Sequence, residues 1–376
     1  MRIYHPFAAR IAAGLAATSL ALVSGLPGAA AASTGWPVVF QAHYGTPALA
    51  NGLFSVATSG KTNAWAVGGT DLSNSTPGAP VADQWNGTSW QASPLPSGLT
   101  GELIAVSAPA PDDAWAVSQL TGYALHWDGT SWSVARTWPE HQLPTQITDV
   151  TAFSPTNVWV FGGPGAFPGI GTWHLIGTTW HHVTGLATGV TFVSALSRSD
   201  MWAIGDTAAP EDTLQHYNGT TWQRLSSPAL TGLNFTRILA LSDTNVWVIG
   251  SPGGGPKEQL LHFDGTQWSS VPITVPSGVQ LVSIASDGHG GLWFSGFGSS
   301  AQWAVHRSAA GAWSSTNLGS GRGIFDLALI PGTTSLWGAG GLNTATGAVH
   351  IGTQHFACHF GHAVLGHVRW IAFHEH

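Results

Sequence analysis

Short runs of β-forming residues alternate with turn residues along most of the chain, and this pattern returns once every 43 to 50 residues. One tryptophan within an apolar run marks each return: Trp65, Trp115, Trp159, Trp202, Trp247, Trp293 and Trp337. A repeat in the forties, built from segments too short to be helices, is typical of β-propellers, in which each repeat forms one blade. We therefore predict an all-β fold, a single seven-bladed β-propeller of four-stranded antiparallel blades.

The second repeat shows the four expected strands, which we name A to D from the channel outward. They cover residues 103–108, 114–117, 124–127 and 132–134. The turn between strands C and D is an Asn-Gly or Asp-Gly pair in four repeats, at residues 86–87, 128–129, 218–219 and 264–265. Both residue types accept the positive φ of a tight hairpin, so these pairs indicate turns.

A second residue type recurs with the tryptophans, a histidine expected on strand C: His126, His174, His216, His262, His306 and His350. Six histidines in one chain raise the possibility of a metal site. However, strand C lies about 10 Å from strand A, because strands in a sheet are about 4.8 Å apart. Histidines of neighbouring blades are then too far apart to share one metal ion, and we expect them to hydrogen-bond within their own blades.

The chain divides into four segments. Arg2 and Arg10 precede an apolar stretch over residues 11–23 and four alanines at residues 29–32, which predicts a signal peptide over 1–32 and a secreted protein. An N-terminal segment, 33–52, contains a strand-like stretch that we expect to complete the last blade. The propeller covers 53–356, and a histidine-rich, poorly ordered tail is expected over 357–376.

Composition excludes several classes of protein. Charged residues make up 8% of the chain, and its formal net charge is −7. Nucleic-acid-binding proteins carry basic clusters, so we expect no nucleic-acid partner. After the first segment no apolar run reaches eighteen residues, so we expect no membrane insertion. One cysteine, Cys358, allows no internal disulfide. We expect a monomer without a cofactor.

Several motifs resemble known repeats. Strand B followed by a glycine pair, as in Trp65-Ala66-Val67-Gly68-Gly69, resembles the kelch repeat, and Asp128-Gly129-Thr130-Ser131-Trp132 resembles a shortened Asp-box. The combination is similar to secreted bacterial propellers, most of which have no assigned activity. The resemblance covers about residues 53 to 356 and implies a fold rather than a function.

The candidate site follows from alignment on the strand B tryptophans. The residues expected beside the central channel are Ser55, Ala105, Asp149, Phe192, Arg237, Ser283 and Asp326. Asp149, Arg237 and Asp326 would either pair with one another or bind a polar ligand.

Further candidates lie in the loops between strands B and C and in the tail. Asp206, Glu211 and Asp212, like Lys257 and Glu258, are candidate ligand contacts or ordinary solvated loop charges. We expect no metal site, although a histidine-rich tract with a cysteine can bind zinc. The alternative metal ligands are His355, Cys358, His359 and His362.

Three functions remain open. The first is a non-catalytic scaffold that binds a glycan, a peptide or an exported protein through loops on one face. The second is an extracellular hydrolase or lyase that uses acids at the channel mouth, such as Asp149, Asp206 and Asp326. The third is a structural component of an envelope or matrix. The repeat accounts for most distinctive residues, so no catalytic residues can be assigned from the sequence.

Overall fold

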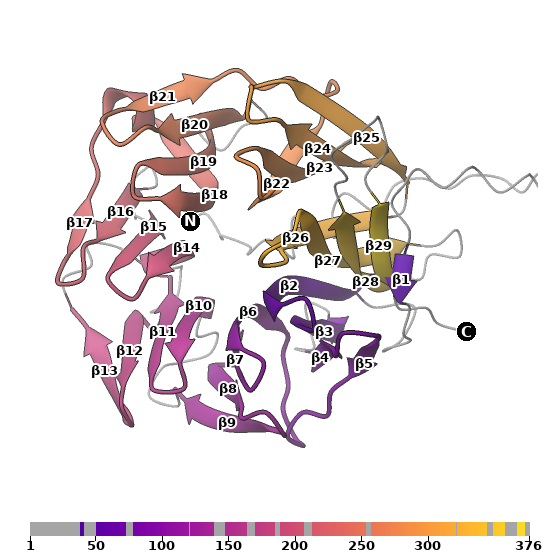
Figure 1. Ribbon diagram of the computed structural model, residues 1–376. Coiled ribbons are helices and arrows are strands. Elements are labelled where there is room, and N and C mark those ends of the chain that lie inside the picture. The colour runs from indigo at the N-terminus through magenta and orange to yellow at the C-terminus, as the bar shows by residue number, and fades with distance from the viewer. Residues whose placement is uncertain are drawn as a thin grey trace, which may run out of the picture.

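The sheets of the protein are arranged in a ring around a central axis, as the computed structural model shows (Figure 1). It describes residues 38–40, 50–72, 78–119, 121–138, 147–163, 170–184, 189–206, 213–252, 257–320, 322–343, 349–357 and 367–372. The predicted all-β propeller of four-stranded antiparallel blades is confirmed. Among the described residues, no helix is long and apolar enough to cross a membrane.

Six blades have four strands each, in chain order from the channel outward. Blade one holds β2 (Ala50–Gly60), β3 (Asn63–Leu72), β4 (Ala79–Trp85) and β5 (Trp90–Ala92). Blade two holds β6 (Leu103–Ala110), β7 (Asp113–Ser118), β8 (Tyr123–Trp127) and β9 (Trp132–Thr137). Blade three holds β10 (Ile147–Ser154), β11 (Asn157–Gly162), β12 (Thr172–Ile176) and β13 (Thr179–Val183).

The next three blades repeat this order. Blade four holds β14 (Gly189–Ser197), β15 (Asp200–Asp206), β16 (Thr213–Tyr217) and β17 (Trp222–Arg224). A 3-10 turn, η1 (Pro228–Leu230), leads to blade five, with β18 (Leu233–Ser242), β19 (Asn245–Pro252), β20 (Gln259–Phe263) and β21 (Trp268–Val271). Blade six holds β22 (Gln280–Ser286), β23 (Leu292–Phe297), β24 (Gln302–Arg307) and β25 (Trp313–Gly319).

The remaining sheet differs from the prediction of seven equal blades. It has five strands in the order β26, β27, β28, β29 and β1 from the channel outward. They span β26 (Arg322–Leu329), β27 (Ser335–Asn343), β28 (Val349–Ala357), β29 (His367–Ala372) and β1 (Val38–Phe40). β1 pairs with β29 in parallel, whereas the other pairs are antiparallel. We call this unit the closing sheet.

The sequence of the closing sheet departs from the repeat after strand C. No Asn-Gly or Asp-Gly pair follows that strand, as is also the case in blades three and six. The register also corrects the predicted histidine. Trp337 pairs with His355, in the position that faces the strand B tryptophan in other blades, whereas His350 pairs with Leu342.

The core consists of seven hydrophobic clusters among the described residues, one between each pair of neighbouring sheets. Each strand B tryptophan belongs to a different cluster and packs against the following sheet. Trp65 has its ring centroid 4.8 Å from that of Trp132, the strand D tryptophan of the next blade. A buried indole of this kind removes on the order of 200 Å² from water. The tryptophan period therefore marks the contacts that hold the blades together.

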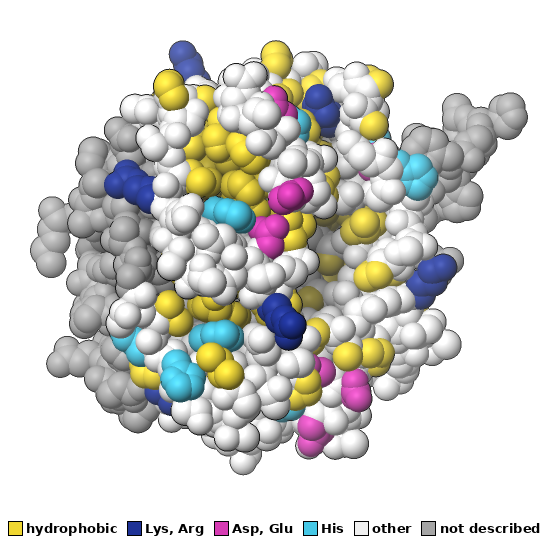
Figure 2. Space-filling view, turned by 60° about the vertical axis from the view of Figure 1, so that its left-hand side comes forward, with side chains coloured by type: hydrophobic (Ala, Val, Ile, Leu, Met, Phe, Trp, Pro, Cys, Tyr) yellow, Lys and Arg dark blue, Asp and Glu magenta, His cyan; other side chains and the backbone are white. Residues whose placement is uncertain are grey.

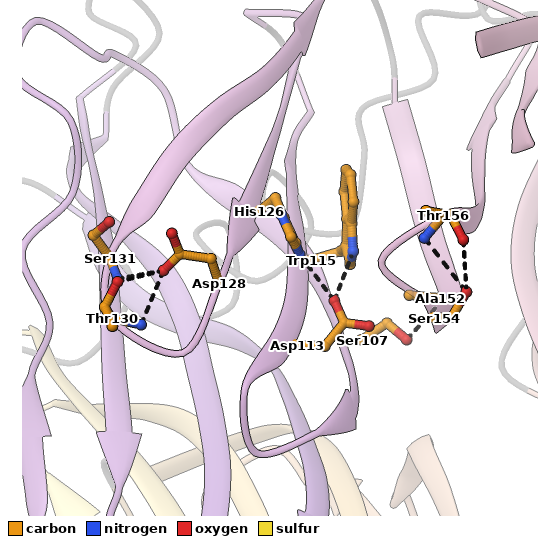
Figure 3. A network of polar contacts seen from close by, with 10 residues as sticks. All are labelled: Ser107, Asp113, Trp115, His126, Asp128, Thr130, Ser131, Ala152, Ser154 and Thr156. Atoms are coloured by element: carbon orange, nitrogen blue, oxygen red, sulfur yellow. Dashed lines mark hydrogen bonds and ion pairs between the residues drawn. The ribbon is translucent and has the colours of Figure 1, made fainter. Parts of the chain in front are cut away.

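The predicted hairpin turns are confirmed by their hydrogen bonds. The Oδ1 atom of Asp128 accepts from the backbone N–H of Thr130 and of Ser131 and from the Thr130 hydroxyl (Figure 3). Asn86, Asn218 and Asp264 accept the same three bonds in their own turns. Each turn uses only the side-chain oxygen, so aspartate and asparagine are equivalent here.

The expected hydrogen bonds of the strand C histidines within their own blades are confirmed in blades two to six. Each of these histidine rings also contacts the strand B tryptophan, with ring centroids 3.9 to 4.5 Å apart. The Nε2 atom of each histidine lies 2.8 to 3.0 Å from a side-chain oxygen (Figure 3 shows blade two). These oxygens belong, in blade order, to Asp113, Asn157, Asp200, Asn245 and Asp287. Carboxylates and amides therefore alternate from blade two to blade six.

The two strand C histidines that bond to asparagine have lowered pKa values. Burial, with a smaller effect of nearby His181, lowers the pKa of His174 to about 4, and burial also lowers the pKa of His262. Both bond to asparagine, which cannot neutralise an imidazolium ion. Because the pKa of His174 in the folded protein is below the ordinary value of about 6.5, its contribution to stability is complete above that pH. The contribution is lost as the pH falls toward 4.

We predict that Asn157→Asp raises the pKa of His174 and reduces the loss of stability in acid. Between pH 7 and pH 5 the melting temperature of the variant should fall by about 2 °C less than that of the wild type, as expected for roughly 1 kcal/mol. NMR titration of the His174 ring measures the pKa directly. Asp113→Asn, the reverse change in blade two, serves as the matched control and should increase the loss in acid. An unchanged His174 titration in Asn157→Asp would contradict the prediction.

Candidate functional site

Each of the seven inner strands has a β-bulge near its first residues, close to the connection from the preceding sheet. A register shift there places one extra residue directly before each of seven positions: Ser55, Ala105, Asp149, Phe192, Arg237, Ser283 and Asp326. These are the residues that alignment on the tryptophans predicts beside the channel, and we call them the axial residues. β-bulges bend a strand and re-aim its side chains, and they are common beside functional sites.

Three of the extra residues are threonines that bond to the neighbouring strand. Thr148, Thr191 and Thr236 each donate their hydroxyl to a strand B carbonyl oxygen 3.2 to 3.3 Å away. The hydroxyl thus gives a hydrogen bond to a strand B carbonyl oxygen next to the bulge, where the backbone hydrogen bonds between strands A and B are interrupted. The bulges are therefore stabilised locally, and the orientation of the axial residues is fixed by the fold.

The three charged axial residues are partly exposed. Asp149, Arg237 and Asp326 are each intermediate in exposure, whereas Ser55 and Ser283 are buried. They are carried by β10, β18 and β26, which are the innermost strands of their sheets. We conclude that their exposed surface faces the axial channel.

Asp149 connects two blades. Its Oδ1 atom accepts from its neighbour Val150 N at 2.8 Å, and its Oδ2 atom accepts from Val193 N of blade four at 2.7 Å. Burial raises the pKa of Asp149 to about 7, against the lowering effect of these hydrogen bonds, and the charge of Asp326 raises it further. Asp149 is thus partly protonated at neutral pH.

Asp326 connects three sheets at the point where the ring closes. Its Oδ2 atom accepts from Val56 N at 3.0 Å and from the Ser55 hydroxyl at 3.2 Å, both in blade one and about 270 residues away along the chain. Its Oδ1 atom accepts from Leu327 N and, at 3.5 Å, from the Ser283 hydroxyl of blade six. Burial raises the pKa of Asp326, and these bonds and the charge of Arg237 oppose the rise.

Arg237 supplies the positive charge of the channel. Its Nη1 atom donates to Thr236 O at 2.8 Å, and its Cζ atom lies 4.0 Å from the ring centroid of Phe192, the axial residue of blade four. Burial lowers the pKa of Arg237 to about 10, while Asp326 and Asp149 oppose the shift. The guanidinium therefore remains charged at neutral pH, and the aromatic face beside it contributes to holding that charge.

Three phenylalanines lie together where the closing sheet meets blades one and six. Phe325, the extra residue of the closing sheet, has its ring centroid 5.8 Å from that of Phe54 in blade one and 5.9 Å from that of Phe297 in blade six. Phe54 and Phe297 are partly exposed. The site thus combines apolar rings with a few fixed polar groups, which is the usual composition of a ligand-binding pocket.

Side chains that link neighbouring inner strands form a series around the ring. Ser55 accepts from Val106 N at 3.3 Å, and Asp149 and Asp326 act in the same way. Where the axial residue cannot accept, as at Ala105 and Phe192, a serine two residues later does so: Ser107 accepts from Ala152 N (Figure 3) and Ser194 from Ala240 N. Alternate residues of a strand lie on one face, so the two positions can exchange this role.

Glu258 performs the same role between blades five and six, and its function was not foreseen from the sequence. Its Oε2 atom accepts from Leu281 N at 2.7 Å, and burial raises the pKa of this carboxyl to about 7. The sequence presents Glu258 as a candidate ligand contact or a solvated loop charge, and no signal within a single repeat indicates a bond to the next inner strand.

The remaining candidate residues contribute less. Asp206 ends β15 and pairs with Gly189, and Glu211 and Asp212 lie outside the described residues. His355 lies in β28, whereas Cys358, His359 and His362 are outside the described part of the chain. Within the described part, no group of three or more histidine, cysteine, aspartate or glutamate residues could hold a metal ion.

Comparison with known proteins identifies the architecture. No protein-family model and no curated protein matches this chain. Among solved structures it is similar to YCF48 bound to D1 peptide, with 14% identity, a TM-score of 0.55, and coverage of 81% of this chain and 95% of that one. YCF48 from Cyanidioschyzon merolae has 16% identity and a TM-score of 0.54, with 78% and 92% covered. Sqt1 from Chaetomium thermophilum has 11% identity and a TM-score of 0.53, with 88% and 87% covered. At such identities the similarity shows the fold alone.

We predict that Asp326→Ala destabilises the protein by about 3 kcal/mol, because it leaves several buried donors in three sheets without an acceptor. Ser107→Ala removes a single bond between blades and should cost about 1 kcal/mol. Denaturant unfolding of the two variants and the wild type measures the difference. Equal losses would show that Asp326 has no special role in closing the ring.

We also predict that stability falls as the pH rises through about 7, because the pKa of Asp149 is higher in the folded protein than the ordinary value of about 3.9. The folded protein therefore binds the Asp149 proton more tightly than the unfolded chain does. The stability that this proton contributes is present at low pH and is lost above pH 7. Asp149→Asn removes this titration. The melting temperature of the wild type relative to that of the variant should fall as the pH rises from about 5 to 7.5 and stay constant above that range; parallel curves from about pH 5 to 7.5 would disprove the assignment.

Proposed function

We propose that this protein is a secreted, non-catalytic binding scaffold that takes a peptide segment of another exported protein at the mouth of its axial channel. The observation that carries the proposal is the set of seven bulges, which aims one residue from each inner strand toward the channel. Three of these residues are charged and partly exposed, beside partly exposed aromatic rings.

The chemistry of the channel favours a peptide. Arg237 can donate to a carboxylate or a backbone carbonyl, Asp149 can accept from an N–H group, and the phenylalanines can cover an apolar side chain. The similar fold of YCF48, which is described as bound to a peptide, is consistent with such a ligand. In contrast, on the face shown in Figure 2 charged side chains are scattered among uncharged ones, so that face does not favour a highly charged partner.

The oxygens of Asp149 and Asp326 accept hydrogen bonds from neighbouring sheets. This use of the carboxylates supports binding rather than acid and base catalysis, which requires oxygens directed at a substrate. We also propose that the closing sheet is the seventh blade of a kelch-like or Asp-box-like propeller. Support comes from β26 and β27, which pair as inner strands do and carry the bulge and Trp337 of the repeat.

The test is a binding screen of the chain from residue 33 onward against overlapping synthetic peptides from proteins exported by the source organism. For any peptide bound by the wild type, Arg237→Gln should weaken binding at least tenfold, equivalent to about 1.4 kcal/mol. Arg224→Gln is the matched control, because Arg224 is exposed on β17 at the outer edge of blade four. Equal affinities of the two variants, or peptide cleavage detected by mass spectrometry, would refute the proposal.

A further inference from the structure

Blade six presents two polar side chains to the closing sheet within an otherwise apolar contact. Ser295 in β23 is 0% exposed and Gln302 in β24 is 1% exposed. The surrounding cluster contains Trp293, Ala304 and Leu318 of blade six, together with Ile324, Leu327 and Leu336 of the closing sheet. Buried polar groups in such a contact require hydrogen-bond partners.

The register places the two side chains on the same face of blade six. Ser295 pairs with Ala304 and Gln302 pairs with Phe297, so Ser295 and Gln302 are diagonal neighbours across the two strands. Diagonal neighbours are about 7 Å apart, within reach of a long side chain or of one bridging molecule. Ser295 also pairs with Ser283, which bonds to Asp326. A polar line therefore runs from the channel wall to Gln302.

Neither side chain has a hydrogen-bond partner within the described protein. The unsatisfied atoms are the hydroxyl oxygen of Ser295 and both the Oε1 and Nε2 atoms of Gln302. Each buried group left unpaired costs about 1–3 kcal/mol. Three such atoms on one face of a single contact would be a large penalty for a folded domain, whose total stability is on the order of 5–15 kcal/mol.

The repeat itself does not require polar residues here. The position of Ser295, two residues after the strand B tryptophan, holds an apolar residue in every other sheet: Val67, Val117, Phe161, Ile204, Ile249 and Ala339. The position of Gln302 holds Glu258 in blade five, where the side chain bonds to the next inner strand. The combination of Ser295 and Gln302 is thus specific to the contact between blade six and the closing sheet.

We propose that this contact contains a buried water-binding site, in which one or two ordered water molecules bridge Ser295 and Gln302. Water can accept from Nε2 and donate to Oε1 at the same time, and buried waters typically make about three hydrogen bonds. A metal ion would leave the Nε2 donor without an acceptor. In addition, the oxygens of Asp326 already accept four hydrogen bonds, so no carboxylate is available for a cation. The water extends the Asp326–Ser283 bonds into the last contact of the ring.

Two substitutions test the site by the sign of their effect. If water bridges the two side chains, Gln302→Met and Ser295→Ala each remove a partner of that water, and each should lower the melting temperature by about 2–5 °C. If the site is dry, both changes remove an unsatisfied polar group and should raise it. Gln223→Met, on the exposed strand β17, is the matched control and should change the melting temperature little.

A crystal structure of the chain from residue 33 onward, at a resolution that shows ordered water, provides the direct observation. We expect electron density within hydrogen-bonding distance of Ser295 Oγ and the Gln302 amide, and its loss in Gln302→Met. Absence of density in the wild type, or an increase in melting temperature in both variants, overturns the proposal. If the two measurements disagree, the wild-type density decides.

Discussion

The hydrogen bond from a side chain of one inner strand to the backbone N–H of the next is the interaction on which this ring depends. Each inner strand has a neighbour on only one side within its sheet, so part of its backbone would otherwise be unpaired beside the channel. Ser55, Ser107, Asp149, Ser194, Glu258 and Asp326 each supply an acceptor for a neighbouring sheet. These bonds join the inner strands of neighbouring sheets. Farther from the axis, the tryptophans fill the contacts between the same sheets. Closure therefore depends on Asp326, because it joins parts of the chain that no short loop connects.

The side chains of each blade fall into two sets, one outside the inner strand and one beside the axis of the ring. Outside the inner strands, stacked tryptophan and histidine pairs with an aspartate or asparagine partner repeat with little variation, and they serve the packing of neighbouring blades. At the channel, the residues differ from blade to blade, from alanine to arginine. Variation within a repeat marks positions that the scaffold does not dictate. The axial residues are such positions, and three of the protein's few charges lie there.

Much of the fold could be predicted because its signals are local. The tryptophan period locates strand B in every sheet, and Asn-Gly or Asp-Gly locates four outer hairpins. Alignment on the tryptophans also identified six axial residues, each ten residues before its tryptophan, because a short turn sets the distance from strand A to strand B; Asp326 is similarly placed, eleven residues before Trp337. The loop between strands B and C varies in length, so spacing could not show that His355, rather than His350, faces Trp337. The bulges and the role of Glu258 depend on contacts between blades, which the sequence of a single repeat does not contain.

The charges at the channel exceed what closure requires. Ser55 shows that a hydroxyl is sufficient to accept the bond from the next inner strand, and Ser107 and Ser194 show that the axial position can be relieved of this task altogether. Placing Asp149, Arg237 and Asp326 there instead costs desolvation energy, as the raised pKa of both carboxyls and the lowered pKa of the guanidinium indicate. Charged groups with shifted pKa values are typical of binding sites, where a ligand can contact them. The excess charge, rather than the ring itself, is therefore the strongest physical argument that the channel mouth binds a ligand.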